Sequence, residues 1–216
     1  MKKIILNTAA FAAVAGMLVM AIPAGATAPV TAPGQNKLLC FDGTTDGGFG
    51  GVCTLKANGA KGPATLDNTD TNPNGDYSGV FIQNTTITGQ TLGNITQLGY
   101  TYSGITSPTP GDLSLNVPVD TDGNGKNDAY LFIDAFYCPG TSGVVNIISD
   151  ATCGIFVNSV EYPNWAALVA AHPTWTVTAS GENFVGTLPF VIAERTPSEA
   201  SAFWTVSNVM LGKGGK

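Results

Sequence analysis

Residues 113–136 read LSLNVPVDTDGNGKNDAYLFIDAF, two apolar segments on either side of an acidic loop. From Leu113 to Val119 every second residue is Leu or Val, a pattern that predicts a strand with one buried face and one face in water. The second segment, 129–136, is apolar at nearly every position and predicts a central strand. Together they predict a β-hairpin and therefore an antiparallel all-β fold.

The loop of this hairpin has the spacing of calcium ligands. Asp120, Asp122, Asn124 and Asp128 stand at loop positions 1, 3, 5 and 9, and Gly125 stands at position 6. Calcium takes roughly six to eight oxygen ligands, which a short loop supplies when carboxylates and amides alternate and a glycine permits a sharp turn. The spacing favours a structural calcium ion as cofactor. The alternative is a metal-free hairpin turn closed by Asx hydrogen bonds.

Over these nine residues the loop resembles the calcium loops of EF-hand, dockerin and thrombospondin type 3 repeats. An EF-hand has a bidentate glutamate at position 12, where this chain has Leu131. A strand rather than a helix is expected to follow, so the loop is not expected to form an EF-hand. A weaker alternation, Asp70, Asn72 and Asn74 before Gly75, is expected to form a plain turn.

The N-terminus has the features of an export signal. Lys2 and Lys3 precede a mostly apolar stretch, and Ala24-Gly25-Ala26 offers the small residues that a signal peptidase accepts. We expect a signal peptide at 1–26, with cleavage after Ala28 or an uncleaved anchor as alternatives, and secretion to the exterior or cell surface. No later apolar stretch is long enough to span a membrane.

The rest of the chain reads as one domain. Residues 27–36 are expected to form a flexible leader, 37–211 an antiparallel, jelly-roll-like β-sandwich of about ten strands, and 212–216 a flexible tail. One short helix is expected at 163–171, ended by Pro173, where it would cap an open end of the sandwich. The expected strands beyond the hairpin are 80–82, 98–102, 144–148, 153–157, 175–178, 188–193 and 204–211.

The four cysteines form two local pairs in sequence. Cys40 with Cys53 and Cys138 with Cys153 are the predicted disulfides, because each cysteine borders an apolar segment and an exported domain normally oxidises such pairs. A zinc site would need a different spacing, and the chain's one histidine, His172, lies far from all four.

Charge and catalytic residue types exclude some functions. The formal net charge of −6 and the scattered basic residues argue against nucleic acid as a partner. His172 is expected to be solvent-exposed without a nucleophile, and no pair among Glu161, Glu182, Glu194 and Glu199 forms a row along a strand. The sequence therefore does not favour an enzyme.

Aromatic residues favour a binding role. Tyr100 and Tyr102 share one face of their expected strand, and Tyr77 follows a polar loop. Flat aromatic rings stack on the C–H faces of sugars, so these three tyrosines are the candidate ligand-binding residues. The alternative is that the aromatic side chains belong to the core.

The pattern over 37–211 is similar to the jelly-roll sandwiches of extracellular carbohydrate-binding modules and concanavalin-like domains, and to uncharacterised secreted bacterial proteins. The matching features are Leu66-Asp67 before a Gly-Asp-Tyr turn, the hairpin at 113–136, an Asn-Trp-Ala-Ala helix and a closing strand at 206–211. The resemblance implies a structural calcium ion and a glycan site on a sheet. A secreted, non-catalytic glycan-binding domain is therefore expected. The alternatives are a structural component of an extracellular layer, matrix or filament, and a glycan-active enzyme.

Overall fold

The computed structural model describes residues 36–46, 49–56, 63–69, 72–84, 86–104, 109–138, 143–178, 188–195 and 202–212. They belong to one compact unit. The predicted signal peptide and most of the predicted leader and tail lie outside the described residues. No helix in the described part of the chain is long and apolar enough to cross a membrane.

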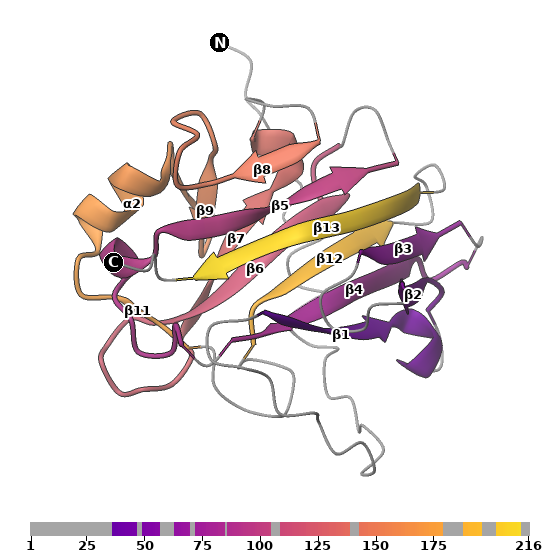
Figure 1. The fold of residues 1–216 in the computed structure, drawn as a ribbon, viewed down its shortest axis with the longest axis horizontal. Coiled ribbons are helices and arrows are strands. Elements are labelled where there is room, and N and C mark those ends of the chain that lie inside the picture. The colour runs from indigo at the N-terminus through magenta and orange to yellow at the C-terminus, as the bar shows by residue number, and fades with distance from the viewer. Residues whose placement is uncertain are drawn as a thin grey trace. The chain divides into compact units, whose positions relative to one another are not determined.

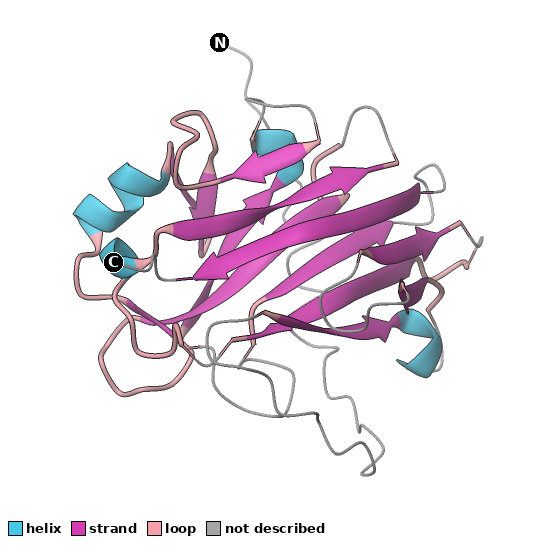
Figure 2. Cartoon of the chain, viewed as in Figure 1, coloured by secondary structure: helices cyan, strands magenta, loops and turns pink. Residues whose placement is uncertain are grey.

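Two antiparallel sheets pack face to face as a sandwich (Figures 1 and 2). The eight-stranded sheet has the order β1 (Lys37–Asp42), β4 (Asp76–Gln83), β12 (Phe190–Arg195), β6 (Leu113–Asp120), β7 (Ala129–Asp134), β9 (Ile155–Val157), β10 (Val160–Tyr162), with β11 (Thr176–Val177) paired to β6. The five-stranded sheet has the order β2 (Val52–Leu55), β3 (Ala64–Asn68), β13 (Ala202–Gly212), β5 (Gln97–Ser103), β8 (Val144–Asn146). The short helices are η1 (Gly43–Asp46), η3 (Leu92–Asn94), η4 (Ala135–Tyr137) and α2 (Trp165–Ala171).

The connections between the sheets follow a jelly roll. The central strands of one sheet lie in the order β3-β13-β5-β8, and those of the other in the order β4-β12-β6-β7. Along the chain, β3 to β6 alternate between the two sheets, and the chain crosses again between β7 and β8 and between β12 and β13. These are two interleaved Greek keys, so the predicted jelly-roll-like sandwich is confirmed.

The hairpin at 113–136 is present and lies in the middle of the eight-stranded sheet. β6 pairs with β7 from Ser114↔Asp134 to Val119↔Ala129. The chain leaves β7 two residues earlier than expected, because the Asp134 carboxylate accepts a hydrogen bond from the Phe136 backbone N–H (2.8 Å) and caps η4. The expectation of a strand through 136 is therefore wrong at its last two residues.

The outer face of β6 differs from its prediction. Ser114, Asn116 and Pro118 were expected to face water, but all eight residues of β6 are buried. Across the sheet, Asn116 is flanked by Phe190 of β12 and Phe132 of β7. Large aromatic neighbours cover this face, and the Asn116 Nδ2 donates to the Ser114 hydroxyl (3.0 Å) in place of water.

The predicted helix and disulfides are confirmed. Asn164 caps α2 by accepting a hydrogen bond from the Ala167 N–H (2.9 Å), and Trp165 and Leu168 point into the core. In Figure 2 this helix lies at one end of the sheets. Cys40–Cys53 joins β1 to β2, with Cα atoms 5.5 Å apart, and Cys138–Cys153 joins the end of η4 to the residues before β9. Such bonds are typical of an oxidising, extracellular environment.

Candidate metal loop and aromatic face

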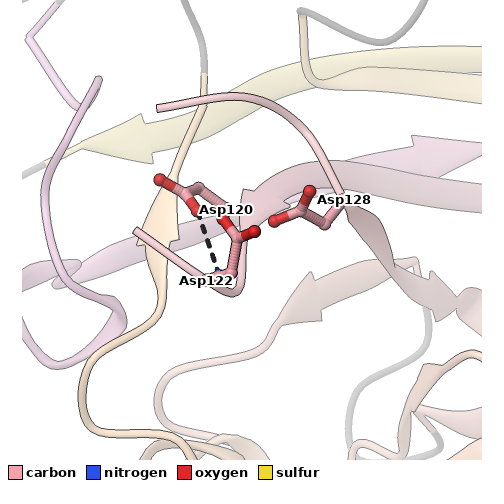
Figure 3. A group of neighbouring side chains, drawn as sticks. All are labelled: Asp120, Asp122 and Asp128. Atoms are coloured by element: carbon pink, nitrogen blue, oxygen red, sulfur yellow. Dashed lines mark hydrogen bonds between the residues drawn. The ribbon is translucent and has the colours of Figure 1, made fainter. Parts of the chain in front are cut away.

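The acidic loop brings three carboxylates together. Oxygen atoms of Asp120, Asp122 and Asp128 lie within 4.8 Å of one another (Figure 3). Asp120 ends β6, and Asp128 directly precedes β7, so the hairpin itself places the two residues side by side. Clustered carboxylate oxygens are the hard ligands that calcium prefers, so these three residues fit such an ion.

Asp120 is the central carboxylate of the loop. Its Oδ1 accepts hydrogen bonds from the N–H groups of Asp122 (3.2 Å) and Gly123 (2.7 Å), and its Oδ2 accepts one from Gly125 (2.7 Å). Burial raises the pKa of Asp120, but backbone N–H donors, with Gly125 and Gly123 foremost, outweigh it and lower the pKa below its ordinary value. The carboxylate is therefore held ionised, as a cation ligand must be.

Asn124, the fourth predicted ligand, is turned to other partners. Its Nδ2 donates to Asp122 Oδ2 (3.0 Å), and its Oδ1 accepts from the Lys126 N–H (2.8 Å). Asp128 Oδ2 accepts from the Thr121 N–H (2.9 Å). These bonds close the loop as a set of Asx turns. The conformation is thus compatible with both readings of the sequence, a cation site and a metal-free turn.

The weaker loop at 70–76 behaves as the expected turn. Asp70 lies outside the described residues, while Asn72 Oδ1 accepts a hydrogen bond from the Asn74 N–H (2.9 Å). Asp76 is buried and forms an ion pair with Arg195, the single arginine of the chain. The side chain of Asp76 is thus committed to the core between the sheets.

Two of the three candidate ligand-binding tyrosines lie in the core. The exposed fraction is 0% for Tyr100 and 8% for Tyr102, and the Tyr100 hydroxyl donates to the Leu113 carbonyl (3.3 Å). Burial, then the charge of Asp134, raises the pKa of Tyr100 well above its ordinary value. The shared face predicted for the pair is correct, but it is the inner face, so a ligand in solvent cannot stack on these rings.

Tyr77, the third candidate, belongs to a row of aromatic rings on the outer face of the eight-stranded sheet. It is half-buried on β4. Neighbouring centroids along the row are 4.4 to 6.5 Å apart. Its members are Phe49, Tyr77, Phe41, Phe81, Phe190 and Tyr130. We call this set the aromatic row.

The aromatic row is most accessible near its ends. Phe41, Phe81 and Phe190 are each less than a tenth exposed, whereas Tyr77 and Tyr130 are half-buried. Gly79, on β4, leaves room for the central rings, because a Cβ there would lie 2.3 Å from the Phe41 ring. The row is therefore a packed apolar band with a tyrosine toward each end.

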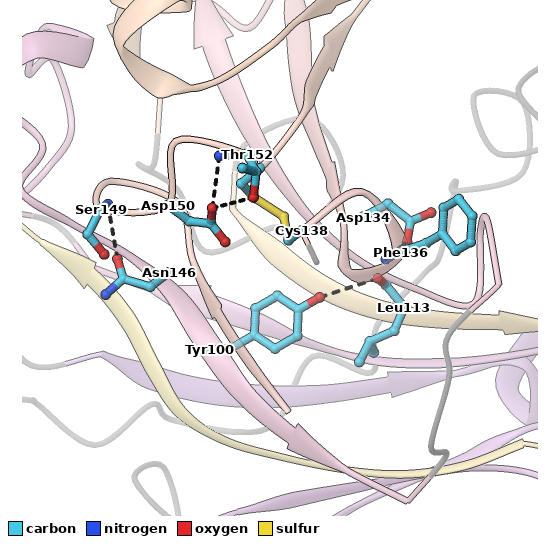
Figure 4. The surroundings of a disulfide bond; sticks show 10 residues. Tyr100, Leu113, Asp134, Phe136, Cys138, Asn146, Ser149, Asp150 and Thr152 are labelled. Carbon is cyan, nitrogen blue, oxygen red and sulfur yellow. Dashed lines mark hydrogen bonds between the residues drawn. A yellow bond between two sulfur atoms is a disulfide. The ribbon is translucent and has the colours of Figure 1, made fainter. Parts of the chain in front are cut away.

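A second aromatic group follows β7. Phe136 is 46% exposed, and its ring centroid is 4.9 Å from that of Tyr137, which is 4.9 Å from that of Phe156. In Figure 4 the Phe136 ring points away from the Cys138 disulfide. This group was not predicted from the sequence. Its signal was an aspartate followed two residues later by adjacent aromatic residues before a cysteine.

Asp134 anchors that group. It is fully buried, and its two carboxylate oxygens accept hydrogen bonds from the N–H groups of Gly111 (2.6 Å) and Phe136 (2.8 Å). Burial raises the pKa of Asp134 to about 6, which the two N–H donors partly oppose and the nearby Asp112 supports. Because Asp134 is enclosed, it positions the chain rather than contacting a ligand.

His172 is not the exposed residue that was expected. Its Nε2 lies 2.6 Å from the Tyr162 hydroxyl, and its ring stacks on Trp175 with centroids 3.6 Å apart. The partner of its Nε2 is therefore a tyrosine hydroxyl rather than a serine, threonine or carboxylate. Of the four glutamates considered, Glu161 and Glu194 lie on β10 and β12, and Glu182 and Glu199 are outside the described residues.

Comparisons of the chain with protein-family models, with curated proteins and with solved structures find no match.

Proposed function

We propose that this protein is an extracellular, non-catalytic domain that binds a glycan along the outer face of its eight-stranded sheet. The observation that carries the proposal is the aromatic row, which runs across the sheet from β1 to β7. The C–H faces of sugar rings stack on such side chains, so the half-buried tyrosines toward the two ends of the row would offer two stacking positions for one oligosaccharide.

Tyr77 and Tyr130 would make the principal ligand contacts. Both are half-buried, and the packing of the row fixes the orientation of their rings. Rigid rings lose little conformational entropy when they bind, which favours affinity. The more buried phenylalanines of the row would support them rather than stack on sugars.

We also propose that the acidic loop holds a structural calcium ion. Asp120, Asp122 and Asp128 would supply carboxylate ligands, and backbone carbonyls and water would complete the shell. Such an ion joins the end of β6 to the start of β7, and Tyr130 is the second residue of β7. Calcium would thus stabilise the hairpin that carries one proposed binding residue.

The test is a depletion assay on insoluble polysaccharides, including cellulose, chitin and peptidoglycan. The wild-type protein should be retained on at least one of them, and Tyr77→Ala and Tyr130→Ala should each be retained less. Phe203→Ala is the matched control, because Phe203 is an exposed aromatic residue (45%) on β13 of the other sheet. Equal retention of all four proteins would show that binding, if any, does not use this face.

A structural role in an extracellular layer is the second candidate. Val52 and Val160 are 45% and 54% exposed and lie on the edge strands β2 and β10, where strand pairing between molecules begins. Concentration-dependent polymers in size-exclusion chromatography, together with no affinity for glycans, would favour this role. A monomer retained on a glycan would favour binding.

A further inference from the structure

A small gap lies beside Gly154, in the segment between the second disulfide and β9. A Cβ atom placed on Gly154 would lie 3.5 Å from Glu161 Oε1 and 3.6 Å from Tyr137 Cβ, which are ordinary contact distances. Glu161 Oε1 and Tyr137 Cβ therefore both border a space that has room for one methyl group. The two atoms are within about 7 Å of each other. We call this space the Gly154 gap.

The backbone on the Tyr137 side of the gap is held in place. The Gly154 N–H donates to the Tyr137 carbonyl (2.9 Å), and the residues next to these two, Cys153 and Cys138, form the second disulfide. Both cysteines are buried. A ligand in the gap would meet a preorganised surface, which reduces the entropic cost of binding.

Aromatic surface lies next to the gap. Tyr137 contacts Phe136 on one side and Phe156 on the other, and Phe136 is 46% exposed. Because Phe156 is directly opposite Glu161 in the β9–β10 ladder, the carboxylate and the ring group lie on the same face of the sheet. A ligand could therefore contact an aromatic ring and a carboxylate together.

The charges around the gap favour a cation. Glu161 is exposed, and its carboxylate forms no ion pair or hydrogen bond with the described residues. Burial, then the charges of Asp134 and Glu161, raises the pKa of Tyr137, so both carboxylates act on its hydroxyl. The chain's formal net charge of −6 would also attract a cationic ligand.

We propose that Phe136, Tyr137 and Glu161 bind an amino sugar whose 2-amino group is protonated, so that the preferred glycan carries unacetylated amino groups. This inference rests on the proposed glycan-binding function. The sugar face would stack on Phe136, and the ammonium group would pair with Glu161 beside the Tyr137 ring. An N-acetyl group removes the charge and so removes that part of the affinity.

The test compares a glucosamine oligosaccharide with its fully N-acetylated counterpart by isothermal titration calorimetry, at constant pH and ionic strength. We expect the wild-type protein to bind the glucosamine form about fivefold to tenfold more tightly, the effect of one exposed ion pair with a cation–π contact. Glu161→Gln should abolish this preference and leave binding of the acetylated form unchanged. Phe136→Ala should weaken both.

Gly154→Ala tests the gap without removing any binding group. Its methyl would fill the gap at ordinary contact distances, so the fold should be retained and the preference for the glucosamine form lost. Gly93→Ala, in η3, is the matched control, because its added methyl also meets only ordinary contact, with Val169 at 3.5 Å. Phe203→Ala serves the same purpose for Phe136→Ala. Both controls should bind as the wild type does.

Equal affinity of the wild-type protein for both oligosaccharides, or an undiminished preference in Glu161→Gln, would overturn the inference. If neither oligosaccharide binds, glucosamine monomer is titrated while backbone amide resonances are recorded by NMR. Resonance shifts at Tyr137 and Gly154 that disappear in Glu161→Gln would support the cation site, even though the proposed glycan-binding function would then be wrong. The absence of such shifts would overturn the cation site as well.

Discussion

The buried carboxyl group of Asp134 predicts an unusual dependence of stability on pH. In the unfolded chain its pKa returns to about the ordinary value of 3.8, whereas burial holds it at about 6 in the folded state. Between these pH values the folded protein keeps a proton that the unfolded chain has released. The free energy of unfolding should therefore fall as pH rises from 3.8 to 6 and change little above that.

The magnitude follows from the size of the pKa change. One pKa unit corresponds to about 1.4 kcal/mol, so ionising Asp134 in the folded state should cost about 3 kcal/mol by pH 7. This value applies without a large correction for solvent screening, because the side chain is fully buried. The carboxyl of Asp120, whose pKa is lowered, acts in the opposite direction but at pH values below 3.8.

Urea denaturation at several pH values between 4 and 7, at constant ionic strength and with chelator present, would measure this effect. Asp134→Asn is the reference, because an amide stays neutral throughout the range. It can accept only one of the two N–H hydrogen bonds that Asp134 accepts, but that cost does not vary with pH. The wild-type protein should lose about 2.4 kcal/mol relative to the variant between pH 4 and pH 7, because part of the change already lies below pH 4. A constant difference between the two proteins would refute the reasoning.

Three other outcomes are expected. Excess EDTA should lower the melting temperature relative to saturating calcium, because calcium a hundredfold above its Kd adds about 2.7 kcal/mol to the free energy of unfolding. Asp122→Ala should abolish this difference. A wild-type melting temperature that is the same in EDTA and in calcium would show a metal-free turn. Arg195→Met removes the ion pair between Arg195 and the buried Asp76 and should lower the free energy of unfolding, measured by urea denaturation, by about 3 to 5 kcal/mol. Adding Asp76→Asn should recover most of this loss. A loss no larger than the experimental error would contradict a buried ion pair. Replacing Cys40 and Cys53 together by serine should cost about 3 kcal/mol, and non-reducing peptide mapping should find both local disulfides and no thiol, whereas a Cys40–Cys138 link would contradict the strand neighbours.

Local features of the fold were predictable from sequence. The hairpin at 113–136, the helix ended before Pro173 and the two disulfides each depend on residues close together in the chain. The alternation in 98–102 correctly predicted that Tyr100 and Tyr102 share a face. It could not predict which face, because periodicity fixes the relative direction of side chains but not the side on which another sheet packs.

The features that were missed depend on distant strands. The outer face of β6 is covered by Phe190, which comes from a strand more than 70 residues later in the chain. Asp76 meets Arg195 across 119 residues. The strands β1, β2 and β10 are short or lie at sheet edges and carry little alternation of their own. Only the order of the strands brings these partners together, and no local pattern encodes that order.

The Cys40–Cys53 bond has a consequence for how the sandwich can open. β1 and β2 are the edge strands at the same side of the two sheets, so this bond forms a covalent spine along that side. Among the described residues no other disulfide joins the two sheets, because Cys138 and Cys153 both flank strands of the eight-stranded one. We therefore expect partial opening to begin at the far edge, at β8 and β10, although β8 lies within the loop that Cys138–Cys153 closes. Backbone amides there should exchange with solvent sooner than those of β1 and β4, because the edge of the sandwich opposite the Cys40–Cys53 bond opens more easily.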